Sequence, residues 1–438
     1  MWKTEMMKTM KTMKTKDLNQ IMSVLYLGLG YGFIYLWSSW TPEWGLTLFT
    51  AAYVTAVLGY CYGSGRKPAR ESWFWLTVLF AIAIPMNFYL TFGILQILAL
   101  MMAAAYWTES VGGSLLDHGK TSHFIAFDLW NVFVQVPFRN FSAQILVWFS
   151  EKENEQEEGT EQKKMKMSGA MAVVCGLVLV IPVLCMILPL LSRADAGFAR
   201  ATEEITEYLQ RHLAAVLMRL LFAIPVSLYL FGLVYGSIYK VHTDDIKVEQ
   251  LRKMSVQVKR LPQVTVCTVL LVICGVYGFF MGIQGNYLFS AIAGRLPETF
   301  TYAEYARRGF FELCQIGIWT LGILFLANMF AGQTAKALKC CNILLAGETL
   351  LLLITAASKM FLYIRSYGLT INRILPMVFM IWMGMVLISF VLRQRKRFPM
   401  VRICVLAGAV LFCMLCVLPV QHLTELYNTW ARMSGLIP

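Results

Sequence analysis

The feature that most constrains this fold is a series of long apolar stretches separated by short polar connections. A helix needs roughly 20 apolar residues to cross a hydrocarbon core of about 30 Å, and only helices and closed barrels satisfy their backbone hydrogen bonds there. Hydrophobic residues make up 58% of the chain and charged residues 14%, against about 25% charged in soluble domains. We therefore predict an all-α, polytopic integral membrane helical bundle of about eleven transmembrane helices. The expected spans are 21–38, 46–62, 73–89, 91–107, 168–192, 212–238, 263–284, 309–331, 342–363, 374–392 and 403–420.

The stretch from residue 73 to 107 is predominantly apolar but too long for one span. As a single helix it would reach about 50 Å at about 1.5 Å per residue. Pro85 and Asn87 are residue types that interrupt helices and favour turns. We expect the chain to turn back there, so that the stretch supplies two spans.

The basic residues indicate how the bundle is oriented. The formal net charge is +13, and Lys and Arg collect at the N-terminus and on alternate connections, including 66–70, 108–167 and 240–260. Cytoplasmic loops carry such an excess, so we predict a cytoplasmic N-terminus and an outside C-terminus. The basic residues form no compact domain, which argues against nucleic acid and leaves the lipid bilayer as the expected partner. The lysine-rich start has no cleavage pattern, so we expect the first apolar stretch to be retained.

Composition divides the chain into four parts. They are a basic cytoplasmic N-terminus (1–20), a four-span N-terminal bundle (21–107), a cytoplasmic amphipathic segment with a charged linker (108–167) and a seven-span bundle (168–438). Residues 151–166 contain no apolar side chain before Met165 and carry both signs of charge, as solvated linkers do.

The segment before that linker has a mixed character. Residues 124–149 combine aromatic and aliphatic residues with Asp128, Asn131 and Asn140. This pattern predicts an interfacial amphipathic helix, broken near Pro137. The helix would act as an aromatic anchor at the level of the lipid headgroups, or alternatively as a gate or a docking element for a partner.

Small residues predict where helices pack closely. Glycines spaced four apart leave a groove on a helix that another backbone can enter. The pairs with this spacing are Gly28/Gly32, Gly232/Gly236 and Gly278/Gly282.

The chain carries none of the motifs expected of common soluble enzymes. It contains no phosphate-binding glycine loop, no HExxH and no GxSxG, and its five histidines are scattered. Cys413 and Cys416 have CxxC spacing but lie in the last apolar stretch without a second pair, which favours packing over metal binding. The other cysteines are also interpreted as packing residues. We expect no catalytic residue, no metal and no cofactor; whether the protein is an enzyme stays open.

Charged residues on the predicted outer face suggest a binding site. Thr301 and Glu304 form a capping box, so a helix is expected to begin there and to place Glu304, Arg308 and Glu312 on one face. A charge at membrane depth costs at least about 2.5 kcal/mol unless it is paired. We therefore predict an outer vestibule, with structural ion pairing and snorkelling as the alternative. Its expected binding residues are Arg219, Tyr302, Glu304, Tyr305, Arg308, Glu312, Lys359 and Arg365.

One acidic residue lies deep in an expected span. Glu348 is the only acidic group in the span 342–363. It could serve a proton or cation step, or pair with a neighbouring helix.

Several separated segments resemble a bacterial membrane protein family. They are Leu191–Phe198, Tyr287–Phe289 before Leu296 and Pro297, Tyr302–Leu313, Lys359–Tyr363, and Tyr367–Thr370 leading to Arg373. Over approximately 168–430, the chain resembles the family known as domain of unknown function 4173, related to the 4153 group. The resemblance implies a multi-pass protein of the bacterial cytoplasmic (inner) membrane and carries no established activity. Lys359 stands where the family pattern has Arg, which argues against a strict phosphate clamp.

These features favour one function class over two others. Many spans with ionisable residues at membrane depth favour a transporter, permease or lipid-handling protein. The alternative is a non-enzymatic sensor or scaffold that acts with a membrane or cytoplasmic protein partner through 125–166 and 240–262. A membrane enzyme acting on a lipid-linked substrate is a third class, which the absence of paired acidic or histidine motifs makes weaker. The substrate, the direction of transport and the oligomeric state are not indicated by the sequence.

Overall fold

The computed structural model of the chain describes residues 2–39, 44–149, 214–243, 261–289, 310–331 and 336–437, together with single residues and pairs between 180 and 257. All regular elements in these ranges are helices, which confirms the all-α class. Nine helices in the described ranges are long and apolar enough to cross a membrane. They contain the stretches Asp17–Ser38, Gly45–Gly63, Ile94–Gly112, Met218–Tyr239, Gln263–Ile283, Phe310–Phe330, Lys336–Tyr367, Ile371–Arg395 and Met400–Val417.

The two remaining expected spans differ from the prediction in different ways. The expected span 168–192 falls almost entirely outside the described residues. The expected span 73–89 contains α3 (Arg70–Ala83), whose 14 residues reach only about 21 Å. The helix ends because Pro85 begins a short 3-10 turn, η1 (Pro85–Asn87). The turn predicted at Pro85 and Asn87 is present, whereas the count of eleven spans is not confirmed.

The chain divides into two compact units. Unit 1 comprises Met1–Phe88, Leu98–Lys120 and Ala126–Asp245, and unit 2 comprises Tyr89–Ile97, Thr121–Ile125 and Ile246–Pro438.

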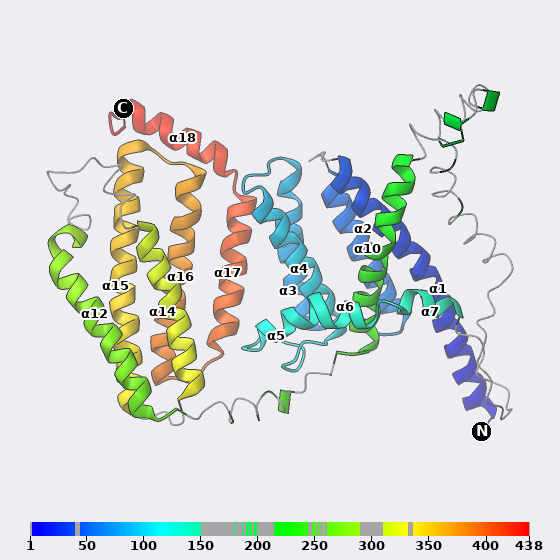
Figure 1. Cartoon of the computed structure of the whole chain (residues 1–438), viewed down its shortest axis with the longest axis horizontal. Coiled ribbons are helices and arrows are strands. Elements are labelled where there is room, and N and C mark those ends of the chain that lie inside the picture. Colours follow the sequence, from blue (N-terminus) through cyan, green and yellow to red (C-terminus); the bar gives the residue numbers. More distant parts are fainter. Residues whose placement is uncertain are drawn as a thin grey trace. The chain divides into compact units, whose positions relative to one another are not determined.

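In unit 1, the long helix α1 (Trp2–Ser39) packs along α10 (Ala214–Tyr239) and also contacts α2 (Gly45–Gly63) (Figure 1). Three buried aromatic side chains fill the space between these helices. The ring of Phe231 lies 5.9 Å from that of Tyr26 and 6.2 Å from that of Tyr60, measured between centroids. Aromatic pairs at such distances add to the stabilisation that burial provides.

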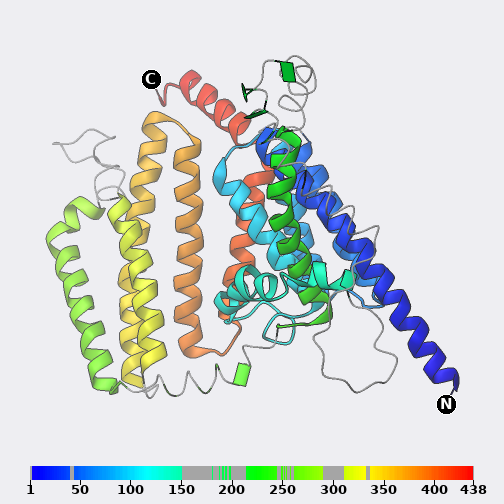
Figure 2. The same cartoon turned by 45° about the vertical axis from the view of Figure 1, so that its right-hand side comes forward.

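The predicted amphipathic segment is a chain of short helices that lies across α10 (Figures 1 and 2). It consists of α5 (Ile125–Trp130), the π-helical η2 (Asn131–Gln135), α6 (Val136–Arg139) and α7 (Ala143–Phe149). The interruption comes after Arg139 and not at Pro137, because Pro137 occupies the first turn of α6, where its missing N–H is tolerated.

Several polar side chains of this segment are buried, and several of its apolar side chains are exposed. The buried polar residues are Asp128, Asn131, Asn140 and Gln144, and the exposed apolar residues are Phe127, Trp130, Phe138, Ile145 and Leu146. A segment in water would have the opposite pattern, since exposed apolar surface is unfavourable there. The segment also buries Val132 and Val136, so its two sides are not sharply divided. The exposed apolar side chains favour the interpretation as a lipid-facing anchor.

Close glycine packing is confirmed for one of the three predicted pairs. A Cβ atom on Gly232 would lie 2.7 Å from the carbonyl oxygen of Pro137 and 2.9 Å from that of Asn140, and one on Gly236 would lie 2.5 Å from the Asn140 side chain. The partner of this groove is α6 and the turn after it, not another span. The prediction was wrong for the other two pairs, where a Cβ would meet no atom nearer than 3.8 Å.

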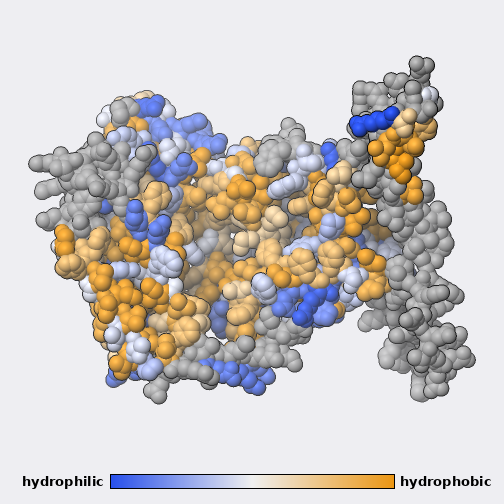
Figure 3. Space-filling model, in the orientation of Figure 1, coloured by the Kyte–Doolittle hydropathy of each residue, from blue (hydrophilic) through white to orange (hydrophobic). Residues whose placement is uncertain are grey.

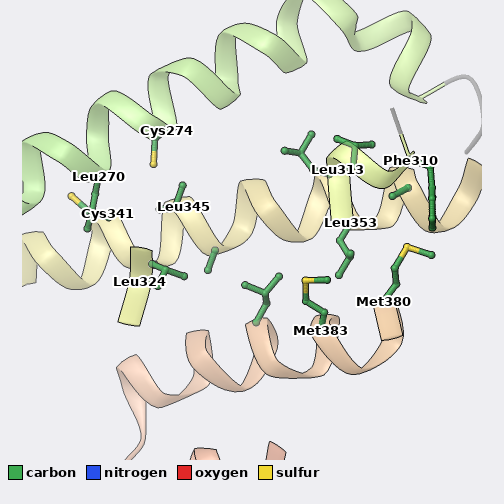
Figure 4. Packing of buried hydrophobic residues seen from close by; sticks show 14 of the residues in the cluster. Leu270, Cys274, Phe310, Leu313, Leu324, Cys341, Leu345, Leu353, Met380 and Met383 are labelled. Atoms are coloured by element: carbon green, nitrogen blue, oxygen red, sulfur yellow. The ribbon is translucent and has the colours of Figure 1, made fainter. Parts of the chain in front are cut away.

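Unit 2 is a bundle in which α15 (Lys336–Tyr367) occupies the centre. It contacts α12 (Gln263–Phe289), α14 (Phe310–Phe330) and α16 (Ile371–Arg395), and α16 contacts α17 (Met400–Val417). Figure 4 shows side chains from these helices pointing into one shared core. They include Leu270 and Cys274 from α12, Leu313 from α14, Leu345 and Leu353 from α15, and Met383 from α16.

The outer sides of these helices are apolar as well. Val264 on α12 is 76% exposed and Trp319 on α14 is 72% exposed. Hydrophobic residues cover much of the described surface in the view of Figure 3. Helices that are apolar on all sides are typical of membrane spans, since lipid replaces water around them.

The last helix, α18 (Val420–Met433), follows α17 after a connection of two residues and lies across the ends of α15 and α16 (Figures 1 and 2). The side chain of Asn428 holds it there: its Oδ1 accepts the N–H of Leu369 at 2.7 Å, and its Nδ2 donates to the carbonyl of Leu369 at 2.9 Å. Gly368 ends α15 in a left-handed conformation, with φ +82°, and so exposes the Leu369 backbone to Asn428.

Candidate functional site

Of the eight residues predicted to line an outer vestibule, the structure describes four. Tyr302, Glu304, Tyr305 and Arg308 lie outside the described residues. The other four, Arg219, Glu312, Lys359 and Arg365, are described.

Two of these four lie close to each other in unit 2. Glu312 is in the first turn of α14, and Lys359 is in the C-terminal half of α15. The charges of the two side chains interact. Lys359 is only 1% exposed, although α15 is a candidate span. An ammonium group in such a place is costly unless nearby groups compensate it, and the acidic partner on α14 offsets part of that cost.

The end of α15 carries a cluster of aromatic and cationic groups. The rings of Tyr363 and Tyr367 are in edge contact, with centroids 5.3 Å apart. The guanidinium carbon of Arg373 lies 4.0 Å from the centroid of the Tyr363 ring, and the same guanidinium donates to the carbonyl of Gly368. Arg365 points outward and is exposed. Sequence reasoning named Arg373 only as part of a resemblance, and its role in this cluster was missed.

Arg219 belongs to unit 1, and its contact is local. Its guanidinium carbon lies 4.9 Å from the centroid of the Tyr35 ring on α1. A cation held over an aromatic face is stabilised by the ring quadrupole. Its membership of the vestibule stays a prediction.

Glu348 has a neighbour on the adjacent helix. Its carboxyl group forms a side-chain hydrogen bond with the thiol of Cys274 on α12. This contact agrees with the interpretation of Glu348 as a group that pairs across helices. None of the nine described cysteines forms a disulfide, and no cluster of three or more His, Cys, Asp or Glu residues that could hold a metal occurs among the described residues.

A buried polar junction in unit 1 was not anticipated. The amide nitrogen of Gln144 on α7 donates to the Ser23 carbonyl of α1 at 2.8 Å and to the Ser227 hydroxyl of α10 at 2.7 Å. The indole nitrogen of Trp148 donates to the Ser23 hydroxyl at 2.9 Å. One side chain therefore joins three helices. The only signal in the sequence is a single amide inside an otherwise apolar stretch, Ala143–Phe149.

We expect Gln144→Leu to lower the free energy of unfolding by about 1–3 kcal/mol, because the substitution leaves the buried Ser227 hydroxyl without its partner. The measurement is the unfolding midpoint of the full-length protein in mixed micelles with increasing denaturing detergent. Gln421→Leu, at an exposed position of α18, is the control and should change stability by less than about 0.5 kcal/mol. Equal midpoints for the two variants would contradict a stabilising role of the junction.

These elements define a class: a multi-pass α-helical membrane protein whose spans bury polar and charged side chains. The model of one protein family, described as a domain of unknown function (DUF4153), matches residues 72–435. The match covers most of the 438 residues, and the chain belongs to this family. The more specific resemblance to domain of unknown function 4173 is not confirmed, and the family match begins within α3, well before residue 168. No curated protein and no solved structure matches the chain.

Proposed function

We propose that this protein is a transporter or permease of the bacterial cytoplasmic membrane, acting on a polar solute or on the headgroup of a lipid. The observation that carries the proposal is the burial of Lys359 inside the unit 2 bundle beside Glu312. An ionisable residue at such a position is expensive, and in membrane proteins it usually serves a ligand or an ion. The proposed orientation places the N-terminus inside and the C-terminus outside, so that the two residues open toward the outer face.

The proposed site has both signs of charge. Tyr302, Glu304, Tyr305 and Arg308 directly precede α14 in the sequence, and we place them in the same vestibule as Glu312. Lys359 offers a single point charge, whereas a guanidinium could bind two oxygens of a carboxylate or phosphate at once. A mixed set of acidic and basic groups suits a zwitterionic or anionic polar group.

The test is to identify the molecules that remain bound when the tagged full-length protein is extracted gently from its native membrane. Mass spectrometry would compare the wild type with the double variant Glu312→Gln/Lys359→Met. We expect a solute or lipid that is retained by the wild type and depleted at least about tenfold in the variant, which corresponds to about 1.4 kcal/mol. The matched control is Glu425→Gln/Arg432→Met, which removes one charge of each sign from exposed positions of α18.

Two outcomes would oppose the proposal. Identical sets of bound molecules in wild type and variant would separate Glu312 and Lys359 from ligand binding. A specific protein at near-equal amount, with no bound solute or lipid, would favour the second candidate, a sensor or scaffold. This second candidate is favoured by the segment 125–149, because Gln144 joins the segment to both α1 and α10. Through these bonds the segment could pass a movement of the two helices to a partner.

A further inference from the structure

A second buried ionisable group lies in unit 1, and sequence reasoning did not single it out. Glu109 is in the last turn of α4 (Ile94–Gly112) and its side chain is 0% exposed. Neither of its carboxyl oxygens has a hydrogen-bond partner. Burying an ionised carboxylate without hydrogen bonds costs far more than burying the neutral acid.

The nearest interacting charge does not compensate Glu109, because it is another acid. Asp128 on α5 is also fully buried, and its charge interacts with that of Glu109. Its Oδ1 accepts the N–H of Leu116 at 2.9 Å, while its Oδ2 has no partner. Three carboxyl oxygens from two residues are therefore buried without a donor.

The end of α4 makes a negative charge on Glu109 still less favourable. The helix closes with two hydrogen bonds, from the Ser114 N–H to the Glu109 carbonyl at 3.2 Å and from the Gly113 N–H to the Ser110 carbonyl at 3.1 Å. These are the bonds of a Schellman motif, and Gly113 has the required left-handed φ of +64°. The last turn of a helix carries a partial negative charge, which opposes an ionised carboxyl group there.

The charged groups around this pair offer no counter-charge. Asp117, on the loop after α4, interacts with Asp128 and is acidic itself. The guanidinium of Arg66 donates to the Ile238 carbonyl, and Lys240 Nζ lies 3.5 Å from the Gly113 carbonyl. Within the described residues, no cation makes a salt bridge or hydrogen bond to the Glu109 carboxyl group.

We propose that Glu109 and Asp128 form a proton-binding site buried in unit 1, in which Glu109 stays protonated at neutral pH and Asp128 exchanges a proton with the aqueous phase. When Asp128 releases its proton to water, its carboxyl group becomes a carboxylate stabilised by the Leu116 N–H. Burial raises the pKa of Asp128 from 3.8 to about 6, with the nearby Asp117 adding to the rise and the Leu116 hydrogen bond opposing it. Proton exchange at Asp128 is therefore expected as the pH passes through about 6. The site does not depend on the function proposed for unit 2.

The experiment is infrared spectroscopy of the full-length protein in lipid nanodiscs, titrated with acid in buffer free of sodium. A protonated carboxyl group has a C=O stretching band that a carboxylate lacks, and the band shifts in heavy water. In the wild type we expect a band at neutral pH to which Glu109 contributes and a second component that appears as the pH falls through about 6. Glu109→Gln should weaken the neutral-pH band, and Asp128→Asn should remove the component that titrates.

A substitution at an exposed position serves as the control for these spectra. Glu425→Gln, at an exposed position of α18, should leave both bands unchanged. Size-exclusion chromatography checks that each variant is folded. The two variants affect different bands, so if one of them fails to fold, the other still tests the site. A neutral-pH band of undiminished intensity in Glu109→Gln, or a titrating component that persists in Asp128→Asn, would overturn the assignment. Loss of the neutral-pH band on addition of sodium chloride to the wild type, but not of choline chloride, would also overturn it, since the site would then bind sodium.

Discussion

Gly232→Ala is expected to lower the free energy of unfolding by about 1–3 kcal/mol, which is a typical cost of overpacking. The added methyl group would lie 2.7 Å from the carbonyl oxygen of Pro137 and 2.9 Å from that of Asn140. Both neighbours are backbone atoms, so no side chain can rotate away to make room. The segment containing α6 would have to move from α10, and the hydrogen bonds of Gln144 to Ser23 and Ser227 would weaken with it.

Gly28→Ala is the matched control for this prediction. Gly28 lies on α1 in the same unit, and a methyl group there would meet no atom within 4 Å. Alanine favours helix over glycine by about 1 kcal/mol, so this variant should be neutral or slightly stabilised. Both variants would be compared by their unfolding midpoints in denaturing detergent. If Gly232→Ala unfolds no earlier than Gly28→Ala, the close contact between α10 and α6 does not exist in the folded protein.

The same glycine pairs show what the sequence can predict about packing. Four-residue spacing marks helices that can be approached closely, but it does not identify the partner. Gly232 and Gly236 contact a segment that is not a span, while Gly278 and Gly282 contact nothing closely. The spans themselves were predictable because crossing a hydrocarbon core requires a long apolar run, and nine of the predicted runs are helices of that kind in the described residues.

Two helices differ from the prediction: α18 was not predicted, and α3 was predicted as a full span but is shorter. In α18, apolar Leu423, Leu426, Trp430 and Met433 alternate with polar residues at helical spacing, so no stretch of it is continuously apolar. Similarly, α3 is apolar but ends early because proline interrupts it at residue 85. Hydropathy therefore identified the long apolar spans well, but it identified the shorter helices α3 and α18 poorly.

The sequence singles out a buried ionisable residue as a site candidate only where the residue lies within or beside an expected span. Glu312 and Lys359 were assigned to the same face of the membrane; their charges interact, and their membership of one binding site stays a prediction. Glu109 and Gln144 are buried although they lie near polar connections, where sequence reasoning expects solvated side chains. In a protein surrounded by lipid, polar residues turn inward and apolar residues outward, so a polar residue near a connection does not reveal which side it faces.

Asp128→Asn is expected to stabilise the protein at neutral pH by up to about 3 kcal/mol, because a pKa shift of one unit corresponds to about 1.4 kcal/mol. The pKa of Asp128 is raised by burial from 3.8 to about 6 in the folded state. The folded state therefore binds a proton more tightly than the unfolded chain. The stabilising contribution of this proton is fully present below the ordinary pKa of 3.8 and is lost as the pH rises through about 6. Asparagine is neutral at every pH and does not carry this dependence.

The measurement is the free energy of unfolding of wild type and variant between pH 4 and pH 8. The wild type should become less stable as the pH rises across the window from about 4 to about 6, while Asp128→Asn should have a flatter profile. The difference between the two proteins should be small at the acidic end and reach its full size at neutral pH. Glu425→Gln, an exposed substitution that also removes one negative charge, should follow the wild-type profile. A constant difference at all pH values would mean that the substitution repacks the site without affecting a proton equilibrium, because a change in packing alone has no reason to depend on pH.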